Sequence, residues 1–170
     1  MKLKTRELAI FAMLGAIMYV SKVIMEWIPN VHLLGTLTMA YTLVYRRKAL
    51  YPIYVYVFLN GALGGFNTWW VPYLYIWTVL WGITMLLPKA MPKGVSSIIY
   101  MIVCALHGFG FGVLYAPAQA IMFGLSFEAT LAWIASGFPF DVVHGISNFF
   151  CGMLIMPIVS VLKMLERSGN

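Results

Sequence analysis

Charged side chains are scarce in this 170-residue chain, where they make up 9% of the sequence against 62% hydrophobic residues. Three long stretches contain none at all: 40 residues over 49–88, 34 over 94–127 and 21 over 142–162. Each stretch is long enough to cross a bilayer, since a spanning helix needs about 20 apolar residues. This pattern excludes a water-soluble domain, and we expect a single all-α integral membrane domain over residues 1–170.

Signatures of several enzyme classes are also missing. The chain has no G-x-x-x-x-G-K-[ST] phosphate loop, no G-x-S-x-G nucleophile elbow and no H-E-x-x-H zinc motif. Its two cysteines, Cys104 and Cys151, lie in apolar stretches, where a small hydrophobic role is expected rather than a disulfide or metal site. We expect no catalytic residue, no metal and no cofactor in the chain itself.

The basic residues that are present form four tight groups between the apolar stretches. The groups are Lys2/Lys4/Arg6, Arg46/Arg47/Lys48, Lys89/Lys93 and Lys163/Arg167. Placing all four in the cytoplasm satisfies the positive-inside rule, and it requires an even number of crossings with both termini cytoplasmic. The net charge of +6 is thereby explained without a nucleic-acid partner.

Turn residues divide the apolar stretches into six expected transmembrane helices, at about 7–28, 35–46, 50–65, 70–88, 95–124 and 139–165. The second is only about 18 Å long at 1.5 Å per residue, so other helices must shield it within the membrane. A short surface helix is expected from Ser126, with Gly137 ending it and Pro139 opening the last span.

Three polar residues in the last span, Asp141, His144 and Asn148, follow an i, i+3, i+7 spacing that places them on one helix face. Polar groups inside a membrane normally face a cavity or a partner, so this face is a candidate ligand site. Asp141 has a structural alternative, because an acidic residue in a first helical turn interacts favourably with the helix dipole. For His144 and Asn148 the alternative is hydrogen bonding between helices.

An aromatic segment offers a second part of the candidate site. Tyr73, Trp77 and Trp81 recur every four residues on one helix face, and Asn67 lies nearby as a polar anchor. The pattern favours a pocket for a flat, partly apolar ligand, with an aromatic belt at the membrane interface as the alternative. His32 and His107 have no partner at fixed spacing, so they are expected to be packing residues.

Two spans contain regularly spaced small residues, and the first span also carries a pair of opposite charges. The fifth span repeats small residues every four positions, where helices can approach closely: Cys104, Gly108, Gly112, Ala116, Ala120 and Gly124. Ala9, Ala12 and Ala16 share one face of the first span, for internal packing or for docking to another membrane protein. Lys22 and Glu26 are expected to pair with each other.

The chain resembles, over its whole length, the substrate-binding membrane subunits (S components) of energy-coupling factor vitamin transporters. The resemblance rests on Arg6-Glu7-Leu8-Ala9 after a basic amino terminus, on Ala12-x-x-x-Ala16, on six spans with both ends inside, and on Gly137-x-Pro139-x-Asp141-x-x-His144-x-x-x-Asn148. It implies a multi-pass protein of a bacterial plasma membrane that captures a vitamin or related micronutrient from outside. Loop signatures of the riboflavin, thiamin, biotin and folate subtypes are not found, so the ligand stays open.

The resemblance also implies partners. A transmembrane coupling subunit and two cytoplasmic ATPases would use ATP to drive import, and Ala12 and Ala16 would be the docking contacts. The candidate ligand contacts combine both polar and aromatic segments: Asn67, Trp70, Tyr73, Trp77, Asp141, His144 and Asn148.

Two other classes stay open on the sequence. An ion-coupled secondary transporter would relay protons through Glu26, Asp141 and His144. An intramembrane metalloenzyme would use Asp141, His144 and His107 as ligands.

Overall fold

A computed structural model describes residues 3–88 and 91–168, and the regular structure in these ranges is entirely helical. The expected cytoplasmic residues Lys2 and Lys89 lie outside the described ranges. Eight α-helices and three short 3₁₀ turns follow one another: α1 Thr5–Met25, α2 Leu34–Tyr45, η1 Arg46–Ala49, α3 Leu50–Gly64, η2 Thr68–Trp70, α4 Tyr73–Leu86, α5 Lys93–Phe109, α6 Phe111–Phe123, α7 Phe127–Cys151, η3 Gly152–Leu154 and α8 Ile155–Ser168.

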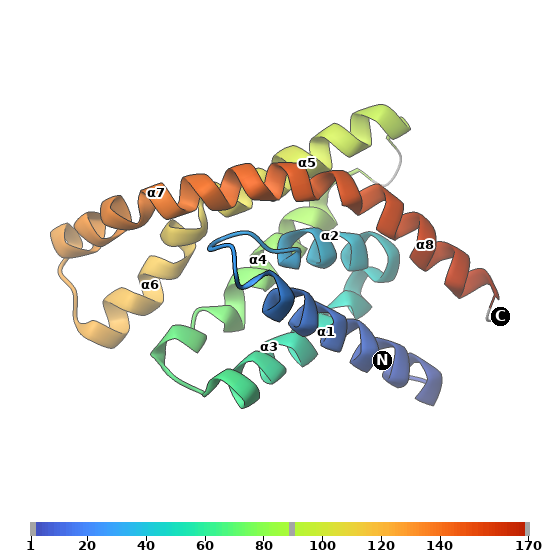
Figure 1. Cartoon of the computed structure of the whole chain (residues 1–170), viewed down its shortest axis with the longest axis horizontal. Helices are drawn as coiled ribbons and strands as arrows, with labels where there is room; N and C mark the ends of the chain where they lie inside the picture. The colour runs from blue at the N-terminus through green and yellow to red at the C-terminus, as the bar shows by residue number, and fades with distance from the viewer. Residues whose placement is uncertain (1–2, 89–90, 169–170) are drawn as a thin grey trace.

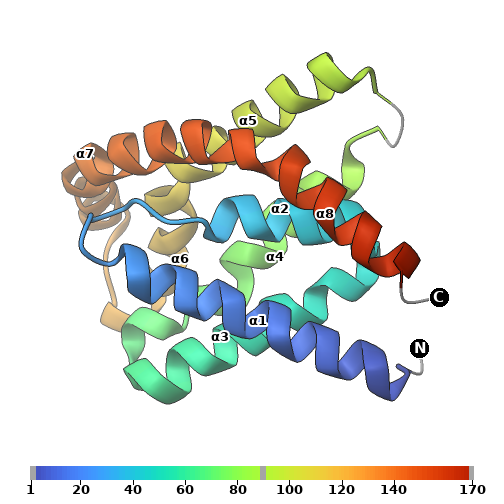
Figure 2. The ribbon, with the colours of Figure 1, turned by 45° about the vertical axis from the view of Figure 1, so that its right-hand side comes forward.

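Helix α2 lies at the centre of the bundle. Residues 34–42 are all buried, and α2 contacts α4 on one side and α8 on another (Figures 1 and 2). Helix α1 packs along α3, while α5 packs along α7. A 12-residue helix is about 18 Å long, and its burial shows how neighbouring helices shield so short a segment.

Three helical segments are long and apolar enough to cross a membrane: Thr5–Met25, Gly94–Phe123 and Phe127–Arg167. Large hydrophobic side chains cover much of the outer surface, and Leu86 and Ile121 are 87% and 84% exposed. A water-soluble protein rarely exposes apolar surface on this scale, whereas lipid-facing surface is apolar throughout. The expectation of an all-helical protein with membrane-crossing segments is therefore supported by the fold.

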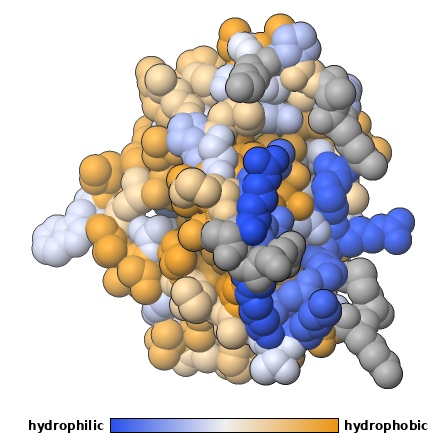
Figure 3. All heavy atoms as spheres, turned by 90° about the vertical axis from the view of Figure 1, so that its right-hand side faces the viewer, coloured by the Kyte–Doolittle hydropathy of each residue, from blue (hydrophilic) through white to orange (hydrophobic). Residues whose placement is uncertain are grey.

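Most of the charged residues gather at one end of the bundle, the end at which the chain begins and finishes (Figures 1 and 3), whereas Lys22, Glu26, Glu128 and Asp141 lie elsewhere. Lys48 forms an ion pair with Glu7, which ties η1 to the start of α1. Arg46 and Lys163 line one hollow, and Arg6 and Glu166 line a neighbouring one between α1, α2 and α8. The basic groups that lie far apart in the sequence thus share one end of the molecule.

The last third of the chain differs from the expected arrangement. Helix α7 begins at Phe127, after Ser126 caps it, but it runs without a break through Gly137 and Pro139 to Cys151. A proline removes one helical hydrogen bond without ending a helix whose two sides are held in place. Trp133 stacks on Tyr115 before Pro139, and Asp141 bonds to Gly112 after it, so α6 holds α7 on both sides.

The expected fifth span is also two helices rather than one. Helix α5 ends at Phe109 and α6 begins at Phe111, with Gly110 between them. The bend directs α6 away from the line of α5, and α6 then packs along the first half of α7 (Figure 1). It also leaves the first amides of α6 facing α7.

Candidate functional site

Seven ring side chains from six different segments meet inside the bundle, and we call them the ring cluster. Trp77 of α4 is the centre, with five of the other rings at centroid distances of 5.7 to 6.1 Å. The members come from the loop over 26–33 and from α3, α4, α5, α6 and α7: His32, Tyr56, Tyr73, Trp77, His107, Phe111 and His144. Trp77 is 1% exposed, so the centre of the cluster is closed to the surface.

All three histidines of the chain belong to this cluster. The rings of His32 and His144 have centroids 4.6 Å apart, and Phe111 lies 4.8 Å from His144. His107 approaches from the other side, 5.7 Å from Trp77. His32 and His107 were expected to be packing residues, and only the tertiary fold brings positions 32, 107 and 144 into one cluster.

Several buried polar atoms in and around the ring cluster have no hydrogen-bond partner among the described residues. They belong to five cluster rings and two asparagines: His32 Nδ1, the Tyr56 hydroxyl, Trp77 Nε1, His107 Nδ1, His144 Nε2, both amide atoms of Asn60 and Asn148 Oδ1. Each buried polar group left without a partner costs about 1–3 kcal/mol. So many unpartnered polar atoms in one region call for partners other than these side chains, either bound water or a bound molecule.

Asn148 lies one turn beyond His144 on the same face of α7 and is fully buried. Its amide nitrogen donates to the backbone oxygen of Cys104 at 3.2 Å, which links α7 to α5. The hydrogen bond between helices that the sequence allowed is therefore present. The amide oxygen keeps its acceptor capacity, so Asn148 can both hold the helices together and contact a ligand.

Asp141 is engaged with the protein itself. Its two carboxylate oxygens accept from the amide of Gly112 at 3.0 and 3.1 Å, where α6 begins. The carboxylate therefore lies at the positive end of a helix dipole. The sequence suggested such an interaction with the helix that contains Asp141, but the structure shows it with α6. The expectation that Asp141 opens its own helix is wrong because α7 already began at Phe127.

The aromatic candidates divide between two places. Tyr73 and Trp77 belong to the ring cluster. Trp70 is half-buried, donates its indole N–H to the oxygen of Val57 at 2.8 Å and packs on Phe66. Asn67 has an exposed side chain that accepts from the amide of Thr68 at the start of η2. The structure thus brings Tyr73, Trp77 and His144 into the ring cluster, with Asn148 one turn beyond His144 on α7, and places Asn67 and Trp70 in the neighbouring α3–α4 connection.

The loop over 26–33 covers this part of the bundle and carries His32. Burial lowers the pKa of the His32 imidazole to about 4, so the ring is neutral near pH 7. Ser147 of α7 donates its hydroxyl to the backbone oxygen of Asn30 at 2.9 Å, which fastens the loop to α7. Trp27, at the start of the same loop, is 90% exposed.

The remaining charged residues and possible metal ligands do not form a second candidate site in the described part of the chain. Lys22 and Glu26 form the expected pair, 3.5 Å apart on α1. Within the described ranges, no group of three or more His, Cys, Asp or Glu side chains is placed to hold a metal ion. His107 is separated from the other two imidazoles by Trp77 and Phe111, which explains why three histidines in one cluster do not make such a group.

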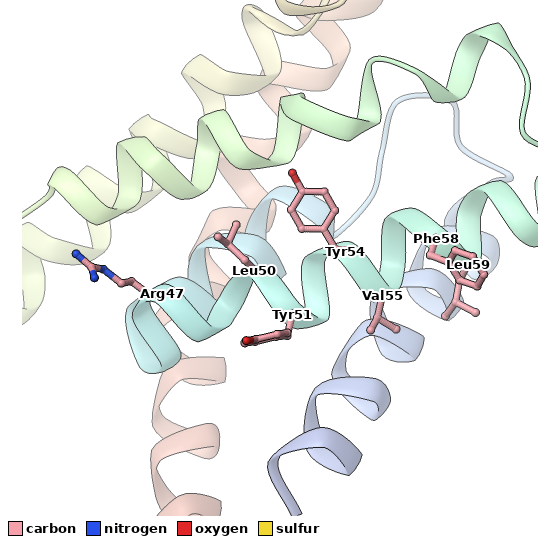
Figure 4. A pocket seen from close by; sticks show the side chains of 7 residues that line it. All are labelled: Arg47, Leu50, Tyr51, Tyr54, Val55, Phe58 and Leu59. Carbon is pink, nitrogen blue, oxygen red and sulfur yellow. The ribbon is translucent and has the colours of Figure 1, made fainter. Parts of the chain in front are cut away.

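Two surface hollows lie away from the ring cluster. One follows the outer side of α3 and is lined by Arg47 at its polar end and by Tyr51, Tyr54, Val55 and Phe58 along its length (Figure 4). The other is a shallow groove on α1, lined by Met13, Ala16, Ile17, Val20, Ser21 and Ile24. The second includes one of the two alanines expected to dock a partner.

Comparison with protein-family models, with curated proteins and with solved structures gives no match.

Proposed function

We propose that this chain is the substrate-binding membrane subunit of an ATP-driven importer of the energy-coupling factor type. In this proposal it crosses the plasma membrane of a bacterial cell six times, with both termini in the cytoplasm. It captures a vitamin or related micronutrient from outside. A transmembrane coupling subunit and two cytoplasmic ATPases then supply the energy, and the chain itself catalyses no reaction.

The ring cluster is the observation that carries the proposal. Trp77 Nε1, His144 Nε2 and Asn148 Oδ1 are buried without partners among the described residues, which is costly, and a bound ligand would supply those partners. The loop over 26–33, which carries His32 of the cluster, lies towards the end of the bundle opposite the chain termini, and this supports an external location once the positive-inside rule is applied (Figure 1). Binding from outside and energising from inside would then use opposite ends of one molecule.

Access to the cluster requires part of the protein to move, because Trp77, His107 and His144 are at most 4% exposed. The loop over 26–33 is the element best suited to move. It contains no regular helix, carries His32 into the cluster, and is fastened to α7 through the Ser147 hydroxyl. Opening this loop would uncover His144 without disturbing the buried core around α2.

The docking part of the proposal rests on α1. Ala12 is exposed and Ala16 half-buried, on a helix whose other face packs along α3. Large apolar residues surround them on the same surface, among them Met13 and Ile17. A partner helix could approach closely over the two alanines, as small residues allow in membranes.

The test is assembly and transport with the energising subunits. The chain is co-expressed with a tagged energy-coupling factor module, and its recovery on the tag is measured for the parent and for Ala12→Leu/Ala16→Leu. We expect the double variant to reduce recovery at least about tenfold, because two bulky side chains would hold the helices apart.

The matched control is Ala132→Leu/Ala135→Leu, which adds the same bulk to two exposed alanines of α7. We expect it to be recovered like the parent. Failure of the parent chain to assemble with any such module, or ATP-independent uptake by the chain alone down an ion gradient, would refute the proposal.

A further inference from the structure

We propose that the ring cluster binds an uncharged, planar nitrogen heterocycle of one or two rings that carries both N–H and C=O groups, the chemical class of the nucleobases. This inference rests on the proposed function, since it names the kind of solute that the same site would capture. It follows from three properties of the described side chains: their ring geometry, their free donors and acceptors, and their charge.

The ring geometry suits a flat ligand. Trp77 lies tilted by 38° to His107 and by 53° to Phe111, while His32 and His144 meet edge to face at 76°. Such an arrangement presents both ring faces and ring edges to the interior. A planar ligand can therefore stack on one ring and meet the edge of another, which aromatic pairs favour. These rings already contact one another, at centroid distances of up to 6.5 Å, so a ligand can enter only when the loop over 26–33 opens and the rings part, which favours a small ligand.

The free polar atoms define which groups the ligand must carry. His107 Nε2 lies 3.2 Å from the backbone oxygen of Ile76, which can only accept, so Nε2 carries the proton. A neutral imidazole has one N–H, and His107 Nδ1 is therefore an acceptor without a partner. Asn148 Oδ1 is a second free acceptor, because its amide nitrogen already donates to Cys104.

The indole of Trp77 has the opposite requirement. Its Nε1–H can only donate, and it has no acceptor among the described residues. A complementary ligand thus offers donors to His107 and Asn148 and an acceptor to Trp77. Asn60 and the Tyr56 hydroxyl can each serve either role. Alternating N–H and C=O groups around a ring meet this pattern, whereas a hydrocarbon or a simple ether would not.

The charges around the site disfavour ionic ligands, because each is already engaged by a partner. Lys22 is the charged residue that acts on His32 of the ring cluster. Asp141, the buried carboxylate nearest in sequence to His144, is held by the amide of Gly112, and Lys22 pairs with Glu26. A carboxylate or phosphate entering the cluster would lose its water without gaining a counter-ion, which is costly in a buried site. The uncharged state of His32 at neutral pH is in keeping with this reading.

The experiment measures thermal stabilisation and affinity of the purified full-length chain in detergent. Uracil and hypoxanthine serve as neutral one-ring and two-ring probes. Two relatives of uracil are the matched controls: 1,3-dimethyluracil has the same ring without N–H donors, and orotate has the same ring with a carboxylate. We expect at least one neutral probe to raise the melting temperature and to bind, and both relatives to bind at least about tenfold more weakly.

A substitution at Trp77 tests whether the neutral probe binds at the ring cluster. Trp77→Phe keeps a ring and removes the N–H, so we expect the affinity for the bound neutral probe to fall about tenfold. Trp133→Phe makes the same change outside the cluster and should leave the affinity at the parent value. Circular dichroism and gel filtration establish that each variant is folded.

Three results would overturn the inference: orotate binding more tightly than uracil, dimethyluracil binding as tightly as uracil, or no stabilisation by either neutral probe at millimolar concentration. The last result would mean that water alone satisfies the buried polar atoms or that the ligand is of another class. Assembly with the energising module is measured separately, so a failure here leaves the proposed importer role standing. A chain that bound uracil without assembling would instead keep this site and lose that role.

Discussion

Asp141 shows how one side chain can be essential to the fold while lying beside a binding site. Its carboxylate accepts twice from Gly112 where α6 begins, and a charge at that position interacts with the helix dipole. The same residue is the first of the polar trio on α7. Its role in the structure is thus accounted for without a ligand, whereas the free atoms of His144 and Asn148 are not.

Replacement of Asp141 by asparagine separates these roles. Asp141→Asn keeps one acceptor oxygen and the side-chain shape but removes the charge, so we expect a loss of about 1–2 kcal/mol of stability. A lower melting temperature with unchanged affinity for a bound heterocycle would be the expected pair of results. If the affinity fell by an order of magnitude at unchanged melting temperature, Asp141 would belong to the ligand site instead.

The polar trio could be recognised from sequence because helical spacing alone places Asp141, His144 and Asn148 on one face. All three are indeed buried. The part that His32 and His107 play in the cluster could not be recognised. Their proximity to His144 depends on how a loop and α5 pack against α7, and no local pattern encodes contacts between positions more than 35 residues apart.

At the scale of helices, close packing between α5 and α7 depends on small residues. A side-chain carbon added at Gly108 would lie 2.8 Å from the backbone oxygen of His144 and 2.9 Å from the α-carbon of Gly145. Both obstacles are backbone atoms, which cannot turn aside as a flexible side chain could. The four-residue repeat of small residues predicted this close approach correctly, although it did not reveal that the helix is interrupted at Gly110.

Two alanine substitutions should therefore have opposite effects. Gly108→Ala must push α5 and α7 apart, and we expect it to cost about 2 kcal/mol or more. Gly137→Ala lies within α7 with no atom in reach of the new carbon, so we expect a gain of about 0.5–1 kcal/mol from the higher helix propensity of alanine.

Melting temperatures of the two variants in detergent give the comparison, with shifts of roughly 2–4 °C for each kcal/mol in a chain of this size. Stabilisation by Gly137→Ala would also verify in solution that α7 is continuous. A destabilised Gly137→Ala would instead support the helix end that glycine followed by proline suggests in the sequence.

For the molecule as a whole, the distribution of charge is what sets its orientation in the proposed six-span arrangement. Hydrophilic residues gather on the end of the molecule that faces the viewer in Figure 3. Arg46 and Lys163, which are remote in sequence, line one hollow. The loop over 26–33 and the turn between α6 and α7 lie towards the opposite end (Figure 1). The clustering of basic residues between apolar stretches led us to expect such a polarity, because the positive-inside rule would place these groups on one side of the membrane.

Accessibility of single cysteines in intact cells tests that orientation. In a background with Cys104→Ala and Cys151→Ala, a membrane-impermeant maleimide should label Trp27→Cys from outside, since this loop position is 90% exposed. Arg167→Cys, on the exposed end of α8, should be labelled only after the cells are permeabilised. Labelling of both positions in intact cells would place them on the same side and exclude the proposed topology. The reverse pattern would put the charged end outside, where energising subunits in the cytoplasm could not reach it.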